Sequence, residues 1–376
     1  MDIREINLSS QVFYLETNVQ NSKPQEKENY LNKDIKQDIF YFLYDDQINK
    51  KLVIYELNSS NISSIKQKIL YELKYKEDIG YNNIHIISKA NFNNKIYLIF
   101  ISDNNFYNIY AGIFDIELLK YFPIIIDNSP KLKEIIKKIP DKDYITIFEQ
   151  NKIFFFGGLI EQKKLRNNNI TQIHNEEESK RISSRNEYIV NKSCIYFDIE
   201  KLDFDIQKFP ENSLIPRYKL GGTCDNGLIY LLGGFISLLE NNEENNNICN
   251  NLQFTKYFDD KMYQFSVAKI EGENPKDMID CDLFFTKNKF LISFSGYRYS
   301  KLWILNIITN IGVNINLKDK IKMEEFNKEN IILRLIKCDI NEINKQINLI
   351  IAKIIFDEKN KDIKFDIINR NVDINI

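Results

Sequence analysis

The side chains that most often bind metal ions or act as catalytic bases are scarce in this chain of 376 residues. The whole sequence has two histidines, His85 and His174. His85 falls in the strand-like run NIHIIS and His174 in a polar segment, so the two imidazoles are not expected to converge on one ion. A Ser-His-Asp or Cys-His arrangement needs the same scarce side chain. The sequence therefore predicts no metal site, no catalytic triad and no cofactor.

The five cysteines indicate reduced thiols rather than disulfides or a zinc site. Their number is odd and none forms a CxxC pair; they stand at positions 194, 224, 249, 281 and 338. The first residues, MDIREINLSSQVFYLE, lack the basic start and apolar core of a signal peptide. No window approaches the roughly eighteen uninterrupted apolar residues of a membrane span. We expect a cytoplasmic protein in a reducing environment, without membrane insertion.

Signals for phosphate and nucleic-acid binding are also missing. No GxxxxGK(S/T) loop and no GxGxxG after a strand occurs, which argues against a nucleotide enzyme. The 51 basic and 53 acidic residues are mixed along the chain and leave a formal charge of −2, so no basic half is available for a nucleic acid. Plentiful Ile, Asn and Lys indicate the coding bias of an AT-rich genome, such as that of a protist. Motifs are therefore compared by residue class.

Carboxylate pairs are the remaining candidates for catalysis. Asp45-Asp46 and Asp259-Asp260 are adjacent acids, and glycosidases work with two carboxylates. Both pairs lie at the ends of strand-like runs, where Asp favours a turn because its side chain bonds nearby backbone. We interpret them as turn residues, and the sequence predicts a protein that is not an enzyme.

The elements that must position these residues are almost all strands. One segment, SPKLKEIIKKI at 129–139, has an N-cap-like serine and helical spacing. Six apolar runs recur instead: DIFYFLYDD, KIYLIFISD, KIFFFGGLI, GLIYLLGGF, KFLISFSGY and QINLIIAKIIFDE, beginning at residues 38, 95, 152, 227, 289 and 346. A recurrence every 60 residues or so indicates a repeat architecture.

A second strand-like run follows each of the six. It places an aromatic or large aliphatic residue just before an acid or amide, at Glu56, Asp115, Asp198, Asp259, Asn306 and Asp366. That polar residue would begin a turn into another short strand. One more strand lies ahead of the central run in most units. Four strands in each of six units predict an all-β fold, a β-propeller of six four-stranded blades, with seven blades as the alternative.

We expect residues 1–376 to form a single propeller domain. The predicted blades span about 1–70, 71–128, 140–210, 211–272, 273–320 and 328–376. Two polar, low-complexity loop insertions are predicted at 161–190 and 238–252. Two segments are candidates for closing the propeller. VDINI at 372–376 would be the outermost strand of the last blade, or INLSSQVFYLE at 6–16 would supply a strand there or to the first blade.

The middle of the chain resembles the kelch-repeat β-propeller family. IPRYKLGGTCDNGLIYLLGGF (215–235), followed by YFDD, matches a kelch repeat, with Arg217, Gly233, Gly234 and Tyr257 on its pattern. The unit KIFFFGG…CIYFDIE is similar and contributes Gly157, Gly158, Tyr196 and Asp198; the fifth unit keeps Gly296 and carries Trp303. The double glycine is clear in two of six units, one unit has Pro-Arg, and the Trp that often follows the aromatic-Asp strand is missing. The specific resemblance covers about residues 150–300.

This resemblance implies a binding protein more than an enzyme. The galactose oxidase family uses such a propeller with a copper centre, but its imidazole ligands have no counterpart here. We expect a non-catalytic scaffold or assembly subunit that binds a protein partner through loops at a propeller face. One alternative is an enzyme that acts on a sugar or small metabolite with acidic residues at the channel mouth. Another is a substrate receptor in a ubiquitin-ligase complex; no F-box, BTB or RING segment is recognisable, so a separate adaptor would be required.

Two loops after second strands are the candidate binding surfaces, at 102–108 and 295–301. Their aromatic residues and one arginine are types enriched in interface hot spots: Phe106, Tyr107, Tyr297, Arg298 and Tyr299. The alternative is that these loops only cover the edges of adjacent blades. Arg217 is interpreted as a brace between neighbouring blades, with a channel-facing ligand for an acidic group as the alternative.

Overall fold

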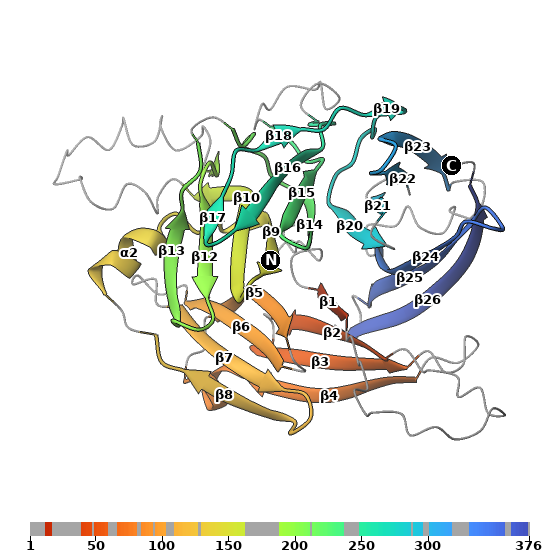
Figure 1. Ribbon diagram of the computed structural model, residues 1–376. Coiled ribbons are helices and arrows are strands. Elements are labelled where there is room, and N and C mark those ends of the chain that lie inside the picture. Colours follow the sequence, from red (N-terminus) through yellow and green to blue (C-terminus); the bar gives the residue numbers. More distant parts are fainter. Residues whose placement is uncertain are drawn as a thin grey trace, which may run out of the picture. The chain divides into compact units, whose positions relative to one another are not determined.

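The computed structural model describes most of the chain as strands. The described residues are 12–16, 39–46, 49–58, 66–80, 84–92, 95–102, 109–126, 129–161, 188–210, 213–236, 248–286, 289–295, 301–317, 331–357 and 362–374. They form two compact units, one of residues 1–125 with 365–369 and one of residues 126–364 with 370–376. The predicted all-β fold with six propeller blades is confirmed, because the strands form six separate sheets (Figure 1).

Two of the six sheets lie in the first unit, and both are antiparallel meanders. Each strand pairs with the next one in the sequence. The first sheet has the order β1 (Val12–Glu16), β2 (Ile39–Asp46), β3 (Lys51–Asn58), β4 (Lys66–Lys74). The second has the order β5 (Ile84–Phe92), β6 (Lys95–Ser102), β7 (Ile109–Asp115), β8 (Lys120–Ile124).

The second unit carries the sheets whose central strands contain or directly precede the double glycines. The sheet order β11-β10-β12-β13, with β9 also on β10, uses β9 (Lys142–Glu149), β10 (Lys152–Glu161), β11 (Tyr188–Val190), β12 (Cys194–Asp198) and β13 (Asp203–Gln207). The order β14-β15-β16-β17, with β18 also on β16, uses β14 (Gly221–Asp225), β15 (Leu228–Leu232), β16 (Gln253–Phe258), β17 (Lys261–Met262) and β18 (Ser266–Val267).

Two further sheets follow along the chain. The order β19-β23-β22-β21-β20 uses β19 (Glu271–Gly272), β20 (Cys281–Thr286), β21 (Phe290–Ser295), β22 (Lys301–Asn306) and β23 (Ile311–Asn316), with β19 parallel to β23. The last sheet has the order β24 (Ile331–Asn341), β25 (Gln346–Asp357), β26 (Asp362–Asp373).

The six predicted central runs are strands β2, β6, β10, β15, β21 and β25, and each pairs with a strand on either side. The strand count per sheet differs from the uniform four that we expected. Three sheets have five strands because β11, β18 and β19 are added, and the last described sheet has three. VDINI is not a separate outermost strand, since β26 continues without a turn to Asp373. The segment that ends at Glu16 instead supplies β1 to the sheet of β2.

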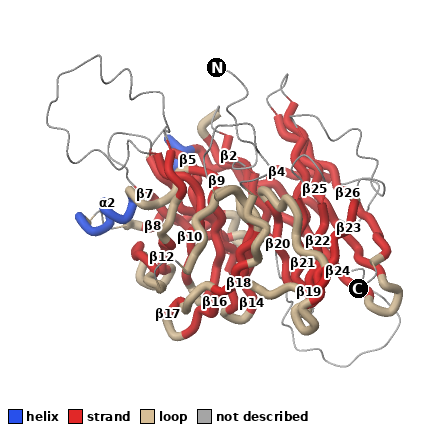
Figure 2. Tube along the Cα trace, turned by 90° about the horizontal axis from the view of Figure 1, so that it is seen from above, coloured by secondary structure: helices blue, strands red, loops and turns tan. Residues whose placement is uncertain are grey.

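The predicted helix is confirmed as α2 (Pro130–Ile136), drawn in blue in Figure 2. Its N-cap is Ser129, whose Oγ accepts a hydrogen bond from the Leu132 amide at 3.1 Å. Proline at the first helical position is compatible with the cap because its missing N–H would have had no partner in the helix. The buried Leu132, Ile135 and Ile136 face inward. A π-helix, η2 (Tyr75–Ile79), follows β4. None of the described helices has the length and apolarity needed to cross a membrane.

Each of the two double glycines contacts the blade that follows it. Gly233 and Gly234 have φ of 72° and 84°, which side chains disfavour. A Cβ on Gly233 would lie 1.9 Å from the Met278 carbonyl oxygen, and the Gly234 amide donates to that oxygen at 2.8 Å. The Gly158 amide donates in the same way to the Arg217 carbonyl at 2.9 Å. The motif is therefore a close backbone contact between consecutive blades.

A chain of hydrogen bonds between consecutive blades also lies near the first strands β9, β14, β20 and β24. The Lys219 amide donates to the Asp143 carbonyl at 2.8 Å, and the Asp280 amide donates to the Lys219 carbonyl at 2.7 Å. All three residues have φ between 48° and 57°, although none is a glycine. In the last step a side chain replaces the amide, because Arg334 Nη1 donates to the Asp280 carbonyl at 3.1 Å. The same backbone geometry thus recurs with unrelated residues.

Apolar side chains fill the space between these sheets. Phe154 of β10 contacts Tyr257 of β16, with ring centroids 4.9 Å apart. Tyr230 of β15 stacks on Phe285 of β20 at 5.9 Å. Trp303 of β22 is fully buried and belongs to the same cluster as Tyr230. The core of the second unit therefore runs from blade to blade.

Most of the insertion predicted at 161–190, and the first part of that at 238–252, lie outside the described residues. The predicted blade boundaries and the single-domain organisation stay predictions.

Candidate functional site

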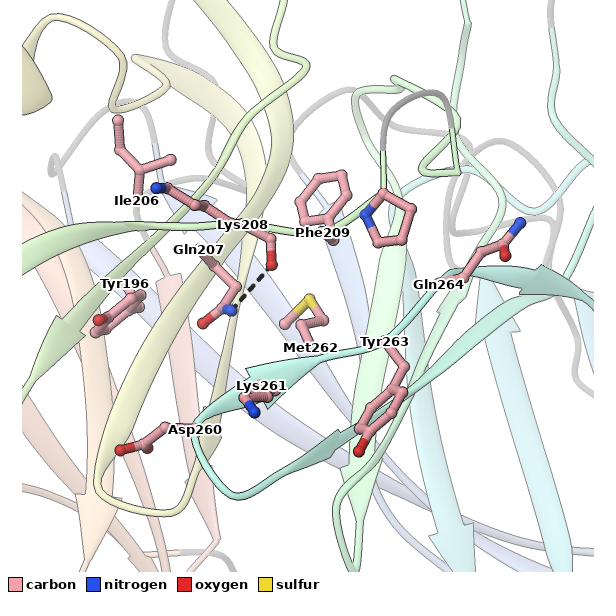
Figure 3. A pocket seen from close by; sticks show the side chains of 11 residues that line it. Tyr196, Ile206, Gln207, Lys208, Phe209, Asp260, Lys261, Met262, Tyr263 and Gln264 are labelled. Carbon is pink, nitrogen blue, oxygen red and sulfur yellow. Dashed lines mark hydrogen bonds between the residues drawn. The ribbon is translucent and has the colours of Figure 1, made fainter.

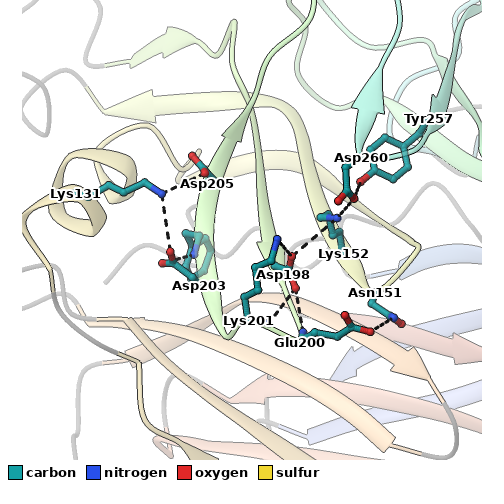
Figure 4. A network of polar contacts seen from close by, with 11 residues as sticks. Lys131, Asn151, Lys152, Asp198, Glu200, Lys201, Asp203, Asp205, Tyr257 and Asp260 are labelled. Carbon is teal, nitrogen blue, oxygen red and sulfur yellow. Dashed lines mark hydrogen bonds and ion pairs between the residues drawn. The ribbon is translucent and has the colours of Figure 1, made fainter.

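A buried lysine ties together two blades of the second unit. Lys152, at the start of β10, keeps only 7% of its side chain exposed. Its Nζ lies 3.9 Å from Oδ2 of Asp198, at the end of β12, and forms a short ion pair with Asp260 in the turn after β16 (Figure 4). The ammonium also lies 5.6 Å and 5.7 Å from the ring centroids of Tyr196 and Tyr257.

These contacts keep Lys152 protonated and Asp260 ionised. The Tyr257 hydroxyl donates to Oδ1 of Asp260 at 3.0 Å. Burial works against the charge of Lys152, but hydrogen bonds with Asp260 and Tyr257 outweigh it and raise the pKa of the ammonium. The hydrogen bonds from Lys152 and Tyr257 lower the pKa of Asp260. The network therefore holds an ammonium and a carboxylate, neither of which is poised to exchange a proton near neutral pH.

Four of the six residues predicted to begin turns do so. The prediction is wrong for Glu56 and Asp366, because β3 stays paired through Glu56 and β26 continues through Asp366. Oδ1 of Asp198 accepts hydrogen bonds from the amides of Glu200 and Lys201, both at 3.0 Å. Asp115 makes the equivalent pair of bonds at 3.0 Å in the first unit. Asp259 occupies its turn with φ of 52° and is exposed. These local bonds explain why an acid or amide recurs at this place.

A pocket opens beside this network, at the outer ends of the two blades. It is about 660 Å³ in volume and is lined by Tyr196, by residues 206–210 at the end of β13, and by residues 260–264 around β17. We call it the β13–β17 pocket. Figure 3 shows the Met262 sulfur in its middle, between the walls that carry Phe209 and Tyr263. The pocket lies entirely within the second unit.

The floor of the pocket is the edge of the hydrophobic core. Met262 is buried in the core cluster that contains Phe154 and Phe156, and Tyr196 and Phe209 pack against that cluster. The ring of Phe209 meets Phe265 edge-on at 5.7 Å. The rim is polar or amphipathic and consists of Gln207, Lys208, Asp260, Lys261, Tyr263 and Gln264. An apolar floor inside a polar rim is the arrangement of a binding pocket.

The neighbouring sheet edge is closed to another strand. β13 is the last strand of its sheet. The amides of Phe204 and Ile206 donate to the carboxylates of Asp203 and Asp205, both at 2.8 Å. Amides two residues apart point to the same edge of a strand, so these carboxylates occupy the groups that an added strand would need. Lys131 of α2 lies 3.9 Å and 3.1 Å from the same two carboxylates.

The side chain of Arg217 is buried within its own blade. Nη1 donates to the carbonyls of Gly233 and Asn251 at 3.2 Å and 3.1 Å, and Nη2 donates to Oε1 of Gln253. Burial lowers the pKa of the guanidinium. Only the backbone carbonyl of Arg217, through Gly158, reaches the preceding blade. With 1% of the residue exposed, the side chain joins the segment before β14 to the end of β15 and the start of β16 within one blade, rather than bracing two neighbouring blades.

The structure does not describe the other predicted binding residues. Phe106, Tyr107, Tyr297, Arg298 and Tyr299, together with Gly296, lie outside the described residues. Sequence reasoning chose loops after second strands and so missed the pocket, which is built from the fourth strands. The sequence did offer one signal for the pocket. An aromatic residue follows each fourth strand closely: Phe209 after β13, in QKFP, and Tyr263 after β17, in KMYQF. Within the part of the chain that the structure describes, no three His, Cys, Asp or Glu side chains group as metal ligands.

Comparison with known proteins gives a likeness in structure only. No family model matches the chain, kelch models included, and no curated protein matches. A solved structure described as that of YjhT is similar over 88% of this chain and 95% of its own, with 11% sequence identity and a TM-score of 0.49.

Proposed function

We propose that this chain is a non-catalytic protein-interaction module that receives an apolar side chain of a partner protein in the β13–β17 pocket. The observation that carries the proposal is the apolar floor, where the buried Met262 and the half-buried Phe209 border an open cavity of about 660 Å³. A cavity with an apolar floor and an aromatic wall matches the anchor pockets of protein interfaces. The kelch-like repeat, whose resemblance implies partner binding, supports the same class of function.

The side chains around the pocket argue against acid-base chemistry. A general acid for a sugar needs a carboxyl group whose pKa is raised toward neutrality. Asp260, the carboxylate on the rim, has its pKa lowered by Lys152 and Tyr257. Lys152 remains protonated and is enclosed by its partners. We therefore propose binding rather than catalysis.

A partner would be recognised through side chains rather than by strand addition. The edge amides of β13 are already bonded to Asp203 and Asp205. Tyr263, with 52% of its surface exposed, offers a large amphipathic contact at the rim. Its backbone is held by the Lys256 carbonyl at 3.0 Å and by the Thr255 hydroxyl at 2.8 Å, so the side chain can be truncated without loosening the turn.

The test is quantitative affinity purification from native cells under gentle conditions, with the wild-type chain and Tyr263→Ala. Phe258→Ala is the matched control, because Phe258 is an equally exposed aromatic residue, at 56%, that does not line the pocket. We expect a stoichiometric partner with wild type and with Phe258→Ala, and at least a tenfold loss with Tyr263→Ala, as for a hot-spot residue. Absence of any stoichiometric partner, or equal recovery with both variants, would contradict the proposal.

A further inference from the structure

The carboxylates around the β13–β17 pocket already have cationic or amide partners. Asp260 on the rim is paired with Lys152 and accepts the Tyr257 hydroxyl. Asp203 and Asp205 of β13 accept backbone amides and lie beside Lys131. Lys131 is thus the shared cation of Asp203 and Asp205, and Lys152 is that of Asp198 and Asp260.

The two lysines of the rim form no such ion pair among the described residues. Lys208 and Lys261 are both exposed, and one lies on each of the two segments that wall the pocket. Among the described residues, no carboxylate lies within ion-pairing distance of either ammonium. A ligand at the mouth therefore meets two ammonium groups without a carboxylate partner among the described residues, above an apolar floor.

The volume of the pocket and the bonded amides at the edge of β13 restrict the shape of the ligand. A cavity of about 660 Å³ admits one or two bulky side chains rather than a whole folded element. The edge of β13 has no free amides at Phe204 and Ile206 for a pairing strand. The ligand must therefore insert side chains from a segment that crosses the mouth.

We infer that the partner segment carries a bulky apolar residue flanked by Asp or Glu, with the apolar side chain on Met262 and the carboxylates on Lys208 and Lys261. This inference rests on the proposed function and names the chemistry of its partner. Complementary charge at the rim would raise the association rate and select acidic over basic segments.

The experiment is fluorescence anisotropy with the full chain and three labelled peptides that share a Leu-Phe centre. Their flanks are Glu, Ser or Lys. For the wild type we expect the Glu-flanked peptide to bind about tenfold tighter than the Ser-flanked one at low salt, with the advantage reduced at high salt. The double variant Lys208→Glu/Lys261→Glu should prefer the Lys-flanked peptide, and Phe258→Ala should behave as wild type.

Equal binding of the Glu- and Ser-flanked peptides, or no binding of the Glu-flanked one, would overturn the inference. An unchanged preference in the double variant would do the same. The proposed function fails on a different result, namely recovery of the cellular partner by Tyr263→Ala. Because both lysines are exposed and lack ion-pair partners among the described residues, charge reversal should leave the fold intact, which circular dichroism checks.

Discussion

Lys152 shows how one buried charge positions the surface beside it. Its ammonium reaches Asp198 on its own blade and Asp260 on the next, 108 residues along the chain. Asp260 belongs to the turn whose following residues line the pocket. The turn is therefore anchored by an ion pair with one buried partner, and the pocket takes its shape from that anchor. Asp260 itself remains 68% exposed, so this anchor is weaker than a fully buried pair.

The ion pair between Lys152 and Asp260 predicts that part of the free energy of unfolding is lost in acid. Asp260 has a lower pKa in the folded chain than its ordinary value of 3.8, so its stabilising effect is present above that value and is lost as the pH falls through the folded pKa. Urea unfolding measured from neutral pH to below about pH 3 should show a smaller acid loss for Asp260→Asn than for wild type. The double variant Lys152→Met/Asp260→Asn should lose as little stability in acid as Asp260→Asn does. A wild-type acid loss retained in both variants would show that other carboxylates cause it.

Gly234 predicts a folding defect of steric origin. Its φ is 84°, and a Cβ there would lie 2.5 Å from the Tyr218 carbonyl oxygen. Gly80 is the control, because its φ is 90° and a Cβ there would meet nothing within 4 Å. Gly80→Ala should cost about 1–2 kcal/mol for the left-handed backbone alone. Gly234→Ala should cost clearly more and Gly234→Val should prevent folding, as thermal and urea unfolding would measure. Equal melting temperatures for the two alanine variants would refute the close approach of the Tyr218 backbone to Gly234.

At the scale of elements, the fourth strands do most to shape the candidate site. β13 ends in the segment that forms one wall of the pocket, and β17 begins the other. Both are short, and β13 is terminal in its sheet. An exposed sheet edge invites pairing with another chain unless its amides are occupied. The carboxylates of Asp203 and Asp205, with α2 alongside, provide that protection.

Removal of the edge carboxylates should therefore promote self-association. Asp203→Ala/Asp205→Ala would free the amides of Phe204 and Ile206, whereas Lys131→Met would remove the exposed ion pairs and leave the amides bonded. We expect light scattering to detect concentration-dependent oligomers with the double variant only. Stability should change by less than about 1 kcal/mol with Lys131→Met, as for exposed ion pairs. A monodisperse double variant would mean that other features protect the edge.

At the largest scale, continuous packing predicts that the second unit unfolds cooperatively. Phe154 contacts Tyr257 of the next blade, and Tyr230 of that blade contacts Phe285 of the one after. Trp303, the single tryptophan of the chain, is buried in this last blade and donates from Nε1 to the Glu273 carbonyl at 2.9 Å. The fluorescence of Trp303 therefore reports on the blade of β22, whereas Phe154 belongs to the blade of β10.

Phe154→Leu should lower stability by about 1 kcal/mol. If the unit is cooperative, the urea midpoint followed by Trp303 fluorescence should fall together with the midpoint followed by circular dichroism. Ile308→Ala, at a residue 69% exposed on the turn after β22, should leave both midpoints unchanged. A fluorescence midpoint that ignores Phe154→Leu would mean that the blades unfold separately.

The sequence alone determined where most strands lie and which residues end them. The six central runs, the helix capped by Ser129 and turn residues such as Asp115 and Asp198 could be predicted, because periodicity, capping and turn chemistry depend on residues a few positions apart. Glu56 and Asp366 carry the same local signal but lie inside the strands β3 and β26. The same local signals could not count the strands of each sheet. β26 shows this, since nothing within VDINI distinguishes a new strand from the end of a longer one.

Only the tertiary structure decided what lies at the candidate site. Lys152 and Asp260, or Phe209 and Met262, meet because two blades pack together, and no spacing in the sequence encodes that distance. The double glycine is instructive for the same reason. As a sequence it is the end of a strand; in the fold, the Gly234 amide bonds to the Met278 carbonyl of the next blade at 2.8 Å. Contacts between segments far apart in the chain depend on how cores are filled, and that is settled by packing rather than by local preference.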